Sequence, residues 1–190
     1  MEQKSFTAYQ LAVTGLMTAL ICILGPMTLT IPVSPIPISL ANLAICLSVL
    51  ILGMKFGTLS CLLYLLIGLI GLPVFSGFSG GVGKLAGPTG GYLVGYIFLA
   101  LIGGYFADKF PGTGIRERVM QAAGLLLGAV VLDAFGTIWL AYMAHMGFGE
   151  ALWAGVIPFI PGDLAKIFLA AAVGPAVRKR LLRQNLLAKE

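Results

Sequence analysis

Charged residues are scarce in this chain of 190 residues: only 10% are Asp, Glu, Lys or Arg, whereas 59% are apolar. An ordinary soluble domain carries about 25% charged residues. The chain therefore lacks the polar surface that a water-soluble domain of this length needs. Its long apolar runs predict a polytopic membrane protein, and they exclude a Rossmann unit, another nucleotide-binding domain and an extramembrane catalytic domain.

Histidine and cysteine are also rare. The three cysteines are Cys22, Cys46 and Cys61. They lie inside apolar runs without the paired spacing of a disulfide framework or a zinc site, so we expect small buried thiols. His145 stands alone, and no nucleophile and base are paired. A P-loop needs Ser or Thr after its Gly-Lys, but Gly83-Lys84 is followed by Leu85. We therefore expect no metal, no cofactor, no catalytic residue and no nucleotide site.

The length allows six membrane-spanning helices at about 20 residues per span. The predicted spans are residues 7–25, 38–53, 56–71, 92–107, 119–142 and 150–177, the last interrupted at Pro158 and Pro161. A tight turn around Lys55 is expected between the second and third spans. The sequence thus predicts an all-α fold, with residues 1–190 forming a single integral-membrane domain.

Basic residues are distributed unevenly between the predicted loops. The side that holds both termini collects ten of the twelve Lys and Arg residues, whereas the other side receives only Lys84. Because basic residues near span ends mark the cytoplasmic side, both termini are predicted to be cytoplasmic. This placement accounts for the net charge of +5 without a nucleic-acid partner.

Two connections rich in proline and glycine then lie on the outer side, at residues 26–37 and 72–91. Irregular backbone near a membrane is tolerated where protein buries it or where it lines a wet cavity. We therefore expect these connections to act as lids over an outward-facing pocket. For residues 26–37, a plain solvated loop is an equal alternative.

Three charged residues, Asp133, Asp163 and Lys166, fall inside predicted spans, where charge is costly and marks functional sites. A rise of about 1.5 Å per residue places all three in the outer half of the membrane. Asp163 and Lys166 are three residues apart and share a helix face, where they form either a private ion pair or the polar part of a binding site. Asp133 is either satisfied by a neighbouring hydroxyl or cation, or functional. A channel is disfavoured because this polar layer is thin.

Small residues recur along the first predicted span at spacings of four, three and four. They are Ala8, Ala12, Gly15 and Ala19. Such a stripe lets another helix approach closely in lipid, and it packs either within this chain or against a partner. Four aromatic residues flank the outer end of the fifth span, where they indicate an interfacial belt. They are Trp139, Tyr142, Phe148 and Trp153.

Three motifs occur in order along the chain: GLPVF at residues 71–75, GPTGGYL at 87–93 and PFIPGDLAK at 158–166. Together they resemble the BioY family, the biotin-binding S components of energy-coupling factor (ECF) transporters. The resemblance covers essentially the whole chain. It implies a multi-pass subunit in the plasma membrane of a prokaryote that captures biotin and is not an enzyme. It also implies docking, through the small residues of the first helix, on a transmembrane T component that carries two ABC-type ATPases.

Biotin's chemistry suits the residues around these motifs. Its ureido ring offers two N–H donors, which Asp163 can accept, and glycine lets the backbone approach a ligand closely. The expected ligand contacts are Asn42, Ser79, Gly87, Thr89, Gly90, Gly91, Tyr92, Asp163 and Lys166. Asn42 stands near the place where the family is expected to carry a Gln-Thr pair. The alternatives are an S component for another small vitamin and, from another class, a small intramembrane enzyme with Asp133 and Asp163 as a carboxylate pair.

Overall fold

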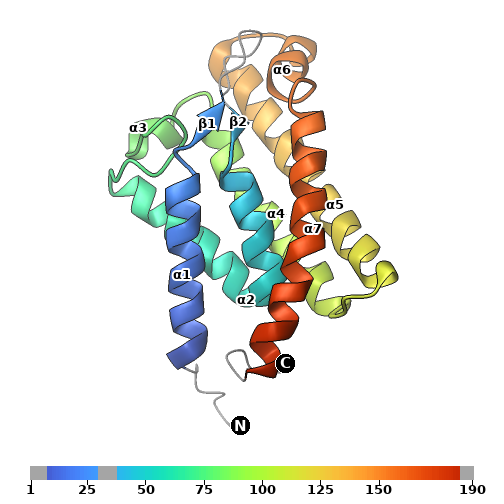
Figure 1. The fold of residues 1–190 in the computed structure, drawn as a ribbon. Helices are drawn as coiled ribbons and strands as arrows, with labels where there is room; N and C mark the ends of the chain where they lie inside the picture. The colour runs from blue at the N-terminus through green and yellow to red at the C-terminus, as the bar shows by residue number, and fades with distance from the viewer. Residues whose placement is uncertain (1–7, 30–37, 185–190) are drawn as a thin grey trace, which may run out of the picture.

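The computed structural model describes residues 8–29 and 38–184, and this part of the chain is almost entirely helical (Figure 1). The helices are α1 (Ala8–Leu24), α2 (Ala41–Leu69), α3 (Val82–Leu85), α4 (Gly90–Lys109), α5 (Ile115–Ala144), α6 (Phe148–Gly155) and α7 (Ile160–Arg183). Two short antiparallel strands, β1 (Thr28–Leu29) and β2 (Ile38–Ser39), place Thr28 opposite Ser39. The predicted all-α class is confirmed for the described residues, apart from this two-stranded pair.

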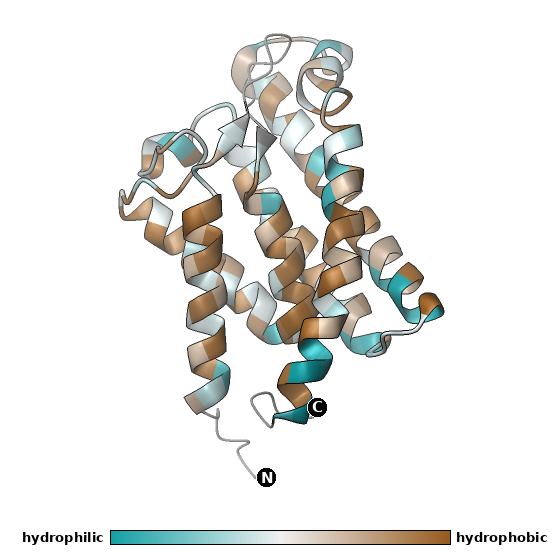
Figure 2. Cartoon of the chain, viewed as in Figure 1, coloured by the Kyte–Doolittle hydropathy of each residue, from teal (hydrophilic) through white to brown (hydrophobic). Residues whose placement is uncertain are grey.

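Four of these helices, α2, α4, α5 and α7, are long and apolar enough to cross a membrane, and α1 is a shorter apolar helix. Two of the six predicted spans merge into the single helix α2. This merger explains part of the difference between the six predicted spans and the four membrane-length helices. Figure 2 shows hydrophilic residues gathered at the end of α7 that carries the C-terminus and at the start of α5, while apolar residues cover the middle of the helices.

Helix α2 folds back on itself at Gly53, whose φ of 81° and ψ of −176° are not helical. A Cβ added at Gly57 would lie 2.6 Å from the Cα of Val49, although eight residues of straight helix rise about 12 Å. Figure 1 accordingly shows α2 running away from β2 and then returning towards α3. The positive φ favours glycine because it lacks a Cβ. The predicted turn therefore exists, but it lies at Gly53 rather than around Lys55.

Asp108, near the end of α4, fastens this turn to two other helices. Its Oδ2 accepts a hydrogen bond of 2.8 Å from the backbone N–H of Met54. Its Oδ1 lies 2.6 Å from Nη2 of Arg178 on α7, and Nη1 of Arg178 donates to the carbonyl of Ala107. A Cβ at Gly53 would collide with the Asp108 carboxylate. The turn in α2, the end of α4 and the C-terminal part of α7 are thus joined at one point.

Glycines on α5 let α4 pack closely against it. A Cβ at Gly124 would collide with Phe106, and one at Gly136 with the ring of Tyr92. In lipid, helices gain no hydrophobic driving force from packing together, so the van der Waals contacts that close approach allows stabilise the pair instead. The buried core between α2, α4 and α5 includes Ile45, Val49, Leu99 and Leu125. The position of α4 relative to α5, and hence that of Tyr92, is fixed by this packing.

Helix α1 turns a polar face inward and its small residues outward. The buried positions are Gln10, Thr14, Met17, Thr18 and Ile21, and Ser60 Oγ of α2 donates to the carbonyl of Thr14. Ala8, Ala12, Gly15 and Ala19 are all exposed. Among the described residues, no atom lies within 4 Å of a Cβ added at Gly15. The alternative that this stripe packs within the chain is therefore wrong for residues 8–29 and 38–184.

The predicted break in the last span separates α6 from α7. Helix α6 ends at Gly155, and α7 begins at Ile160, so Pro158 lies in the break and Pro161 lies in the first turn of α7. Proline is accepted there because the first turn of a helix has no backbone partner for its N–H groups. Helix α7 continues through Pro175 to Arg183, six residues beyond the predicted end of the span.

Candidate functional site

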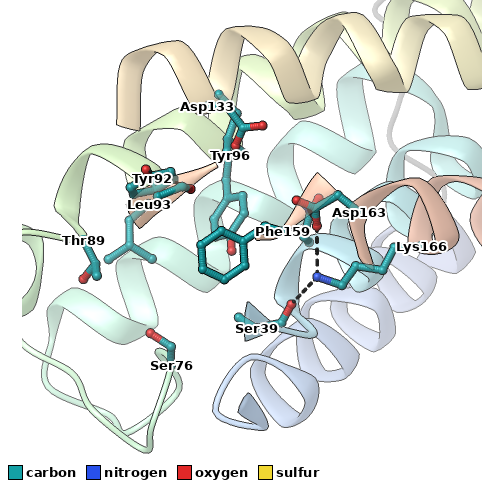
Figure 3. A pocket seen from close by; sticks show the side chains of 13 residues that line it. Ser39, Ser76, Thr89, Tyr92, Leu93, Tyr96, Asp133, Phe159, Asp163 and Lys166 are labelled. Atoms are coloured by element: carbon teal, nitrogen blue, oxygen red, sulfur yellow. Dashed lines mark hydrogen bonds and ion pairs between the residues drawn. The ribbon is translucent and has the colours of Figure 1, made fainter. Parts of the chain in front are cut away.

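A polar cavity of about 70 Å³ opens at the end of the molecule that holds β2 and the break between α6 and α7. Its walls come from β2, α2, the connection at residues 72–89, α4, α5, α6 and α7 (Figure 3). The predicted ligand contacts that line it are Asn42, Thr89, Tyr92, Asp163 and Lys166. Elements far apart in the sequence therefore bring these five residues together.

The Asp163–Lys166 pair lies at the centre of a hydrogen-bonded network. Nζ of Lys166 lies 3.0 Å from Oδ1 of Asp163 and donates to the carbonyl of Ser39 on β2 at 3.0 Å. Nδ2 of the buried Asn42 donates to the same Oδ1 at 3.2 Å. The pair is therefore not private, because α2 and β2 both contribute to it. Among the described residues, nothing binds Oδ2 of Asp163, so this oxygen is free to accept from a ligand.

The start of α7 sets the position of Asp163. Asp163 lies in the first turn of the helix, where a carboxylate interacts favourably with the helix dipole. Its backbone N–H already donates to the carbonyl of Phe159 at 2.9 Å. Because the helix already begins at Ile160, the N–H of Asp163 is not free. The carboxylate, and not the backbone amide, faces the cavity.

Aromatic rings form the apolar part of the lining, and the sequence indicated only one of them. The hydroxyl of Tyr92 donates to the carbonyl of Gly155 at 3.2 Å and so ties α4 to α6. Tyr96 and Phe159 are buried and line the same cavity. Tyr96 follows Tyr92 by four residues and therefore shares its helix face, a spacing that sequence reasoning did not use. Ser39 and Ser76 were also missed.

Four expected contacts, Ser79, Gly87, Gly90 and Gly91, shape the cavity's surroundings instead of lining it. A Cβ at Gly91 would collide with Trp139, and one at Gly90 with the backbone of Leu85. The indole N–H of Trp139 donates to the carbonyl of Gly87 at 2.9 Å. Ser79 Oγ donates to the carbonyl of Ser76 at 2.8 Å. Trp139, predicted to belong to an interfacial belt, thus also holds the glycine-rich connection.

The connection at residues 72–89 is anchored by Phe75, which is fully buried. Its ring lies edge-on to Tyr64 and fills the space that a Cβ at Gly68 would occupy. Further along, the N–H of Gly77 donates to the carbonyl of Pro26 at 3.2 Å, so the two outer connections touch. Most of the other expected lid, residues 30–37, lies outside the described residues.

Asp133 projects from α5 into the same cavity and also lines an apolar groove between α5, α6 and α7. It is half-buried. Across residues 8–29 and 38–184, no hydroxyl or cation forms a hydrogen bond or ion pair with it, although one alternative for this residue required such a partner. The cavity therefore contains two carboxylates and one ammonium group.

Comparisons with known proteins agree on one family. The profile of the BioY family matches residues 1–183. A protein named biotin transporter BioY from Rhizobium etli is 39% identical over 175 residues, which cover 88% of this chain and 91% of that protein. A protein of the same name from Thermotoga maritima is 36% identical and covers 90% and 96%, respectively. The crystal structure of an S-component for biotin from an ECF-type ABC transporter matches with a TM-score of 0.83 at 32% identity, covering 92% of this chain and 95% of that one.

Proposed function

This chain belongs to the BioY family, and from that membership we propose that it is the biotin-binding S component of an ECF-type ABC transporter. It is a multi-pass membrane protein that captures biotin for ATP-driven uptake. The observation that carries this function is the networked Asp163–Lys166 pair, which leaves Oδ2 of Asp163 open in a cavity walled by aromatic rings. The chain binds and releases its ligand without chemical change.

We propose six membrane segments within one integral-membrane domain: α1, the two halves of α2, α4, α5, and α6 together with α7. The fold of α2 at Gly53 supports two crossings by this one helix. Basic residues near the turn of α2 and the end of α7 support cytoplasmic termini. The cavity then faces outward from the plasma membrane of a prokaryote, which suits capture of an external nutrient.

The ureido ring of biotin is the group that the polar end of this cavity suits best. Oδ2 of Asp163 accepts a ureido N–H, and Lys166 holds the other carboxylate oxygen, Oδ1. Tyr92 and its aromatic neighbours enclose the thioether ring, as expected for a dry pocket with a few placed polar groups. The carboxylate tail points towards Thr89 and away from the two acidic side chains, which would repel it.

Ligand entry requires the outer connections to move. The cavity volume of about 70 Å³ is small beside the 300–1,000 Å³ typical of small-molecule sites. We propose that the connections at residues 26–37 and 72–91 separate to admit biotin and close over it. Ser79, Gly87, Gly90 and Gly91 act on the ligand by shaping the second connection, and Asn42 acts by holding Asp163.

Transport requires partners, because the chain carries no nucleotide-binding motif. We propose that it docks on a transmembrane T component that carries two ABC-type ATPases, and that the docking face is the stripe of Ala8, Ala12, Gly15 and Ala19. The exposure of all four residues supports this face. No cofactor and no nucleic acid take part.

Equilibrium binding of radiolabelled biotin to the purified protein tests the function. We expect saturable binding that unlabelled biotin displaces and that other vitamins, such as thiamine and riboflavin, do not. Mass spectrometry of the recovered ligand should find intact biotin, as expected for a protein that is not an enzyme. Saturable binding of another vitamin without binding of biotin would assign the chain to a different substrate, and a modified ligand would indicate catalysis.

A further inference from the structure

Asp133 is the one group in the cavity whose charge the proposed function leaves unexplained. A carboxylate inside a membrane-spanning helix is costly unless it is paired or functional. Lys166 is already committed to Asp163 and to the carbonyl of Ser39. Among the described residues, Asp133 takes part in no hydrogen bond, and the two ion pairs, Lys166–Asp163 and Arg178–Asp108, do not include it. Its open acceptor oxygens therefore face a cavity that a ligand enters.

Asp133 and Asp163 reach this cavity from two different helices. Asp133 is carried by α5 and Asp163 by the first turn of α7, and both side chains line the polar cavity (Figure 3). The described residues thus present two free acceptors, the Asp133 carboxylate and Oδ2 of Asp163, on separate walls. A cyclic urea has the complementary pattern, because its two N–H groups point to opposite sides of its carbonyl.

We propose that Asp133 accepts one ureido N–H of bound biotin while Asp163 accepts the other. This inference rests on the proposed function and adds a ligand-contacting residue to it. The ligand supplies a donor that Asp133 lacks among the described residues, so binding offsets the desolvation of a half-buried carboxylate. A ligand without the second N–H leaves Asp133 unpaired, and a site built around a hydrogen bond rejects such analogues strongly. Asp133 is therefore a specificity determinant for ligands with two ureido donors.

The test combines a substitution with ligands that lack one donor. The purified Asp133→Leu protein is compared with the wild-type protein for binding of biotin and of its two mono-N-methyl derivatives. Leucine removes the acceptor and suits a membrane-spanning helix, so the variant should fold. We expect Asp133→Leu to weaken biotin binding about tenfold or more, as for a hydrogen bond to a charged group. For one N-methyl derivative the substitution should change affinity less than about twofold, because that bond is already absent.

Two controls make the outcome specific. Dethiobiotin, which keeps both ureido N–H groups, should lose as much affinity as biotin does on Asp133→Leu. Thr137→Val, one turn further along α5, removes a buried hydroxyl that does not line the polar cavity. This variant should bind biotin like the wild-type protein. If Asp133→Leu does not yield a monodisperse protein, Asp133→Asn keeps the shape of the side chain and should weaken binding by a smaller factor.

Several results would overturn the inference. One is unchanged biotin affinity in Asp133→Leu or, where that variant does not fold, in Asp133→Asn. Another is an equal loss of affinity for biotin and for both N-methyl derivatives, which would mean that Asp133 acts on the fold and not on a ureido donor. These outcomes leave biotin binding by the wild-type protein intact and so spare the proposed function. Absence of biotin binding in the wild-type protein itself would overturn both.

Discussion

The rings of Phe75 and Tyr64 meet edge-on with their centroids 5.5 Å apart and their planes at 83°. Tyr64 belongs to the returning half of α2, and Phe75 belongs to the connection that borders the cavity. An aromatic pair of this geometry adds about 0.5–1.5 kcal/mol to the area that it buries. The contact therefore fixes one end of the connection at residues 72–89 on the helical core, and Trp139 holds the other end at Gly87.

Replacing Phe75 with alanine should release this anchor. We expect a stability loss of about 3–5 kcal/mol, as for truncation of a buried phenylalanine, together with weaker biotin binding because Ser76 and Thr89 lose their positions. Thermal unfolding and biotin titration measure the two effects. Phe78→Ala, in the same connection but at a residue that is 71% exposed, should change neither quantity. Equal effects of the two substitutions would contradict the anchoring role.

The Asp163–Lys166 pair should prove to be a ligand site. Asp163→Asn alone leaves Lys166 without its charge partner, and breaking a buried pair costs about 3–5 kcal/mol. The double change Asp163→Asn with Lys166→Met should restore folding, yet bind biotin at least about tenfold more weakly, since hydrogen bonds to charged groups contribute about 1.5–3 kcal/mol. A well-folded double variant with near-native affinity would show that the pair is only structural.

Bulky residues on the exposed stripe of α1 should block docking without affecting ligand capture. Gly15→Leu or Ala19→Trp should abolish biotin uptake by cells that express the whole transporter, because a neighbouring helix can no longer approach closely. Biotin binding to the isolated subunit should stay unchanged. Leu16→Trp places a bulky side chain on the exposed surface beside the stripe and should leave uptake near normal. Loss of binding in Gly15→Leu would point to a packing role within the chain.

Thiol labelling in intact cells should establish which end of the molecule faces outward. Val82→Cys lies on the exposed side of α3 and should react with an impermeant thiol reagent, more slowly once biotin is bound. Ile115→Cys, at the start of α5, should react only after the membrane is permeabilised. The native Cys46 and Cys61 are buried and should remain silent, and labelling of the unmodified protein corrects for Cys22. Labelling of Ile115→Cys in intact cells would reverse the topology.

The turn of α2 should tolerate no side chain. Gly53→Ala combines a positive φ with a collision against Asp108, so we expect a loss of at least about 1–2 kcal/mol in stability. Asp108→Asn keeps an acceptor for the N–H of Met54 but loses the charge that pairs with Arg178, and it should be milder. Thermal unfolding of the two variants, with biotin affinity as a second measurement, tests this order. A larger stability loss in Asp108→Asn than in Gly53→Ala would mean that the Asp108–Arg178 ion pair contributes more to stability than the glycine does.

The helices were predictable from the sequence because bilayer-length apolar runs, bounded by proline, glycine and basic residues, determine them. The arrangement of these helices in space could not be predicted from the sequence. The Pro158–Pro161 break and the face shared by Asp163 and Lys166 follow from local spacing. The bond from Asn42 to Asp163 joins residues 121 positions apart, and no local pattern encodes such a distance. The same limit applies to Tyr96 and Phe159, whose shared cavity depends on how α4 lies relative to the break between α6 and α7.

The glycines illustrate a second limit. A glycine-rich run predicts that the backbone closely approaches a ligand or another part of the chain, but it does not show which of the two the neighbour is. At Gly91 the neighbour is Trp139, a residue of α5, and at Gly68 it is the ring of Phe75. The sequence predicted that the glycines of residues 87–91 contact the ligand. In the structure, Gly90 and Gly91 instead leave room for other parts of this chain, Leu85 and Trp139. Only the packed neighbours distinguish these two uses.

The spacing of Asp163 and Lys166 also affects how the protein is made. Helix α7 is the least apolar of the four membrane-length helices, with a mean hydropathy of 1.4 over its best window. It must nevertheless leave the translocon for lipid. Two opposite charges three residues apart can neutralise each other within a single helix, before any other helix is in contact. Asn42 is synthesised much earlier, so it is already in the membrane when Asp163 arrives. Pairing of the two residues proposed to recognise the ligand thereby reduces the cost that either charge alone would add to insertion of the helix that carries them.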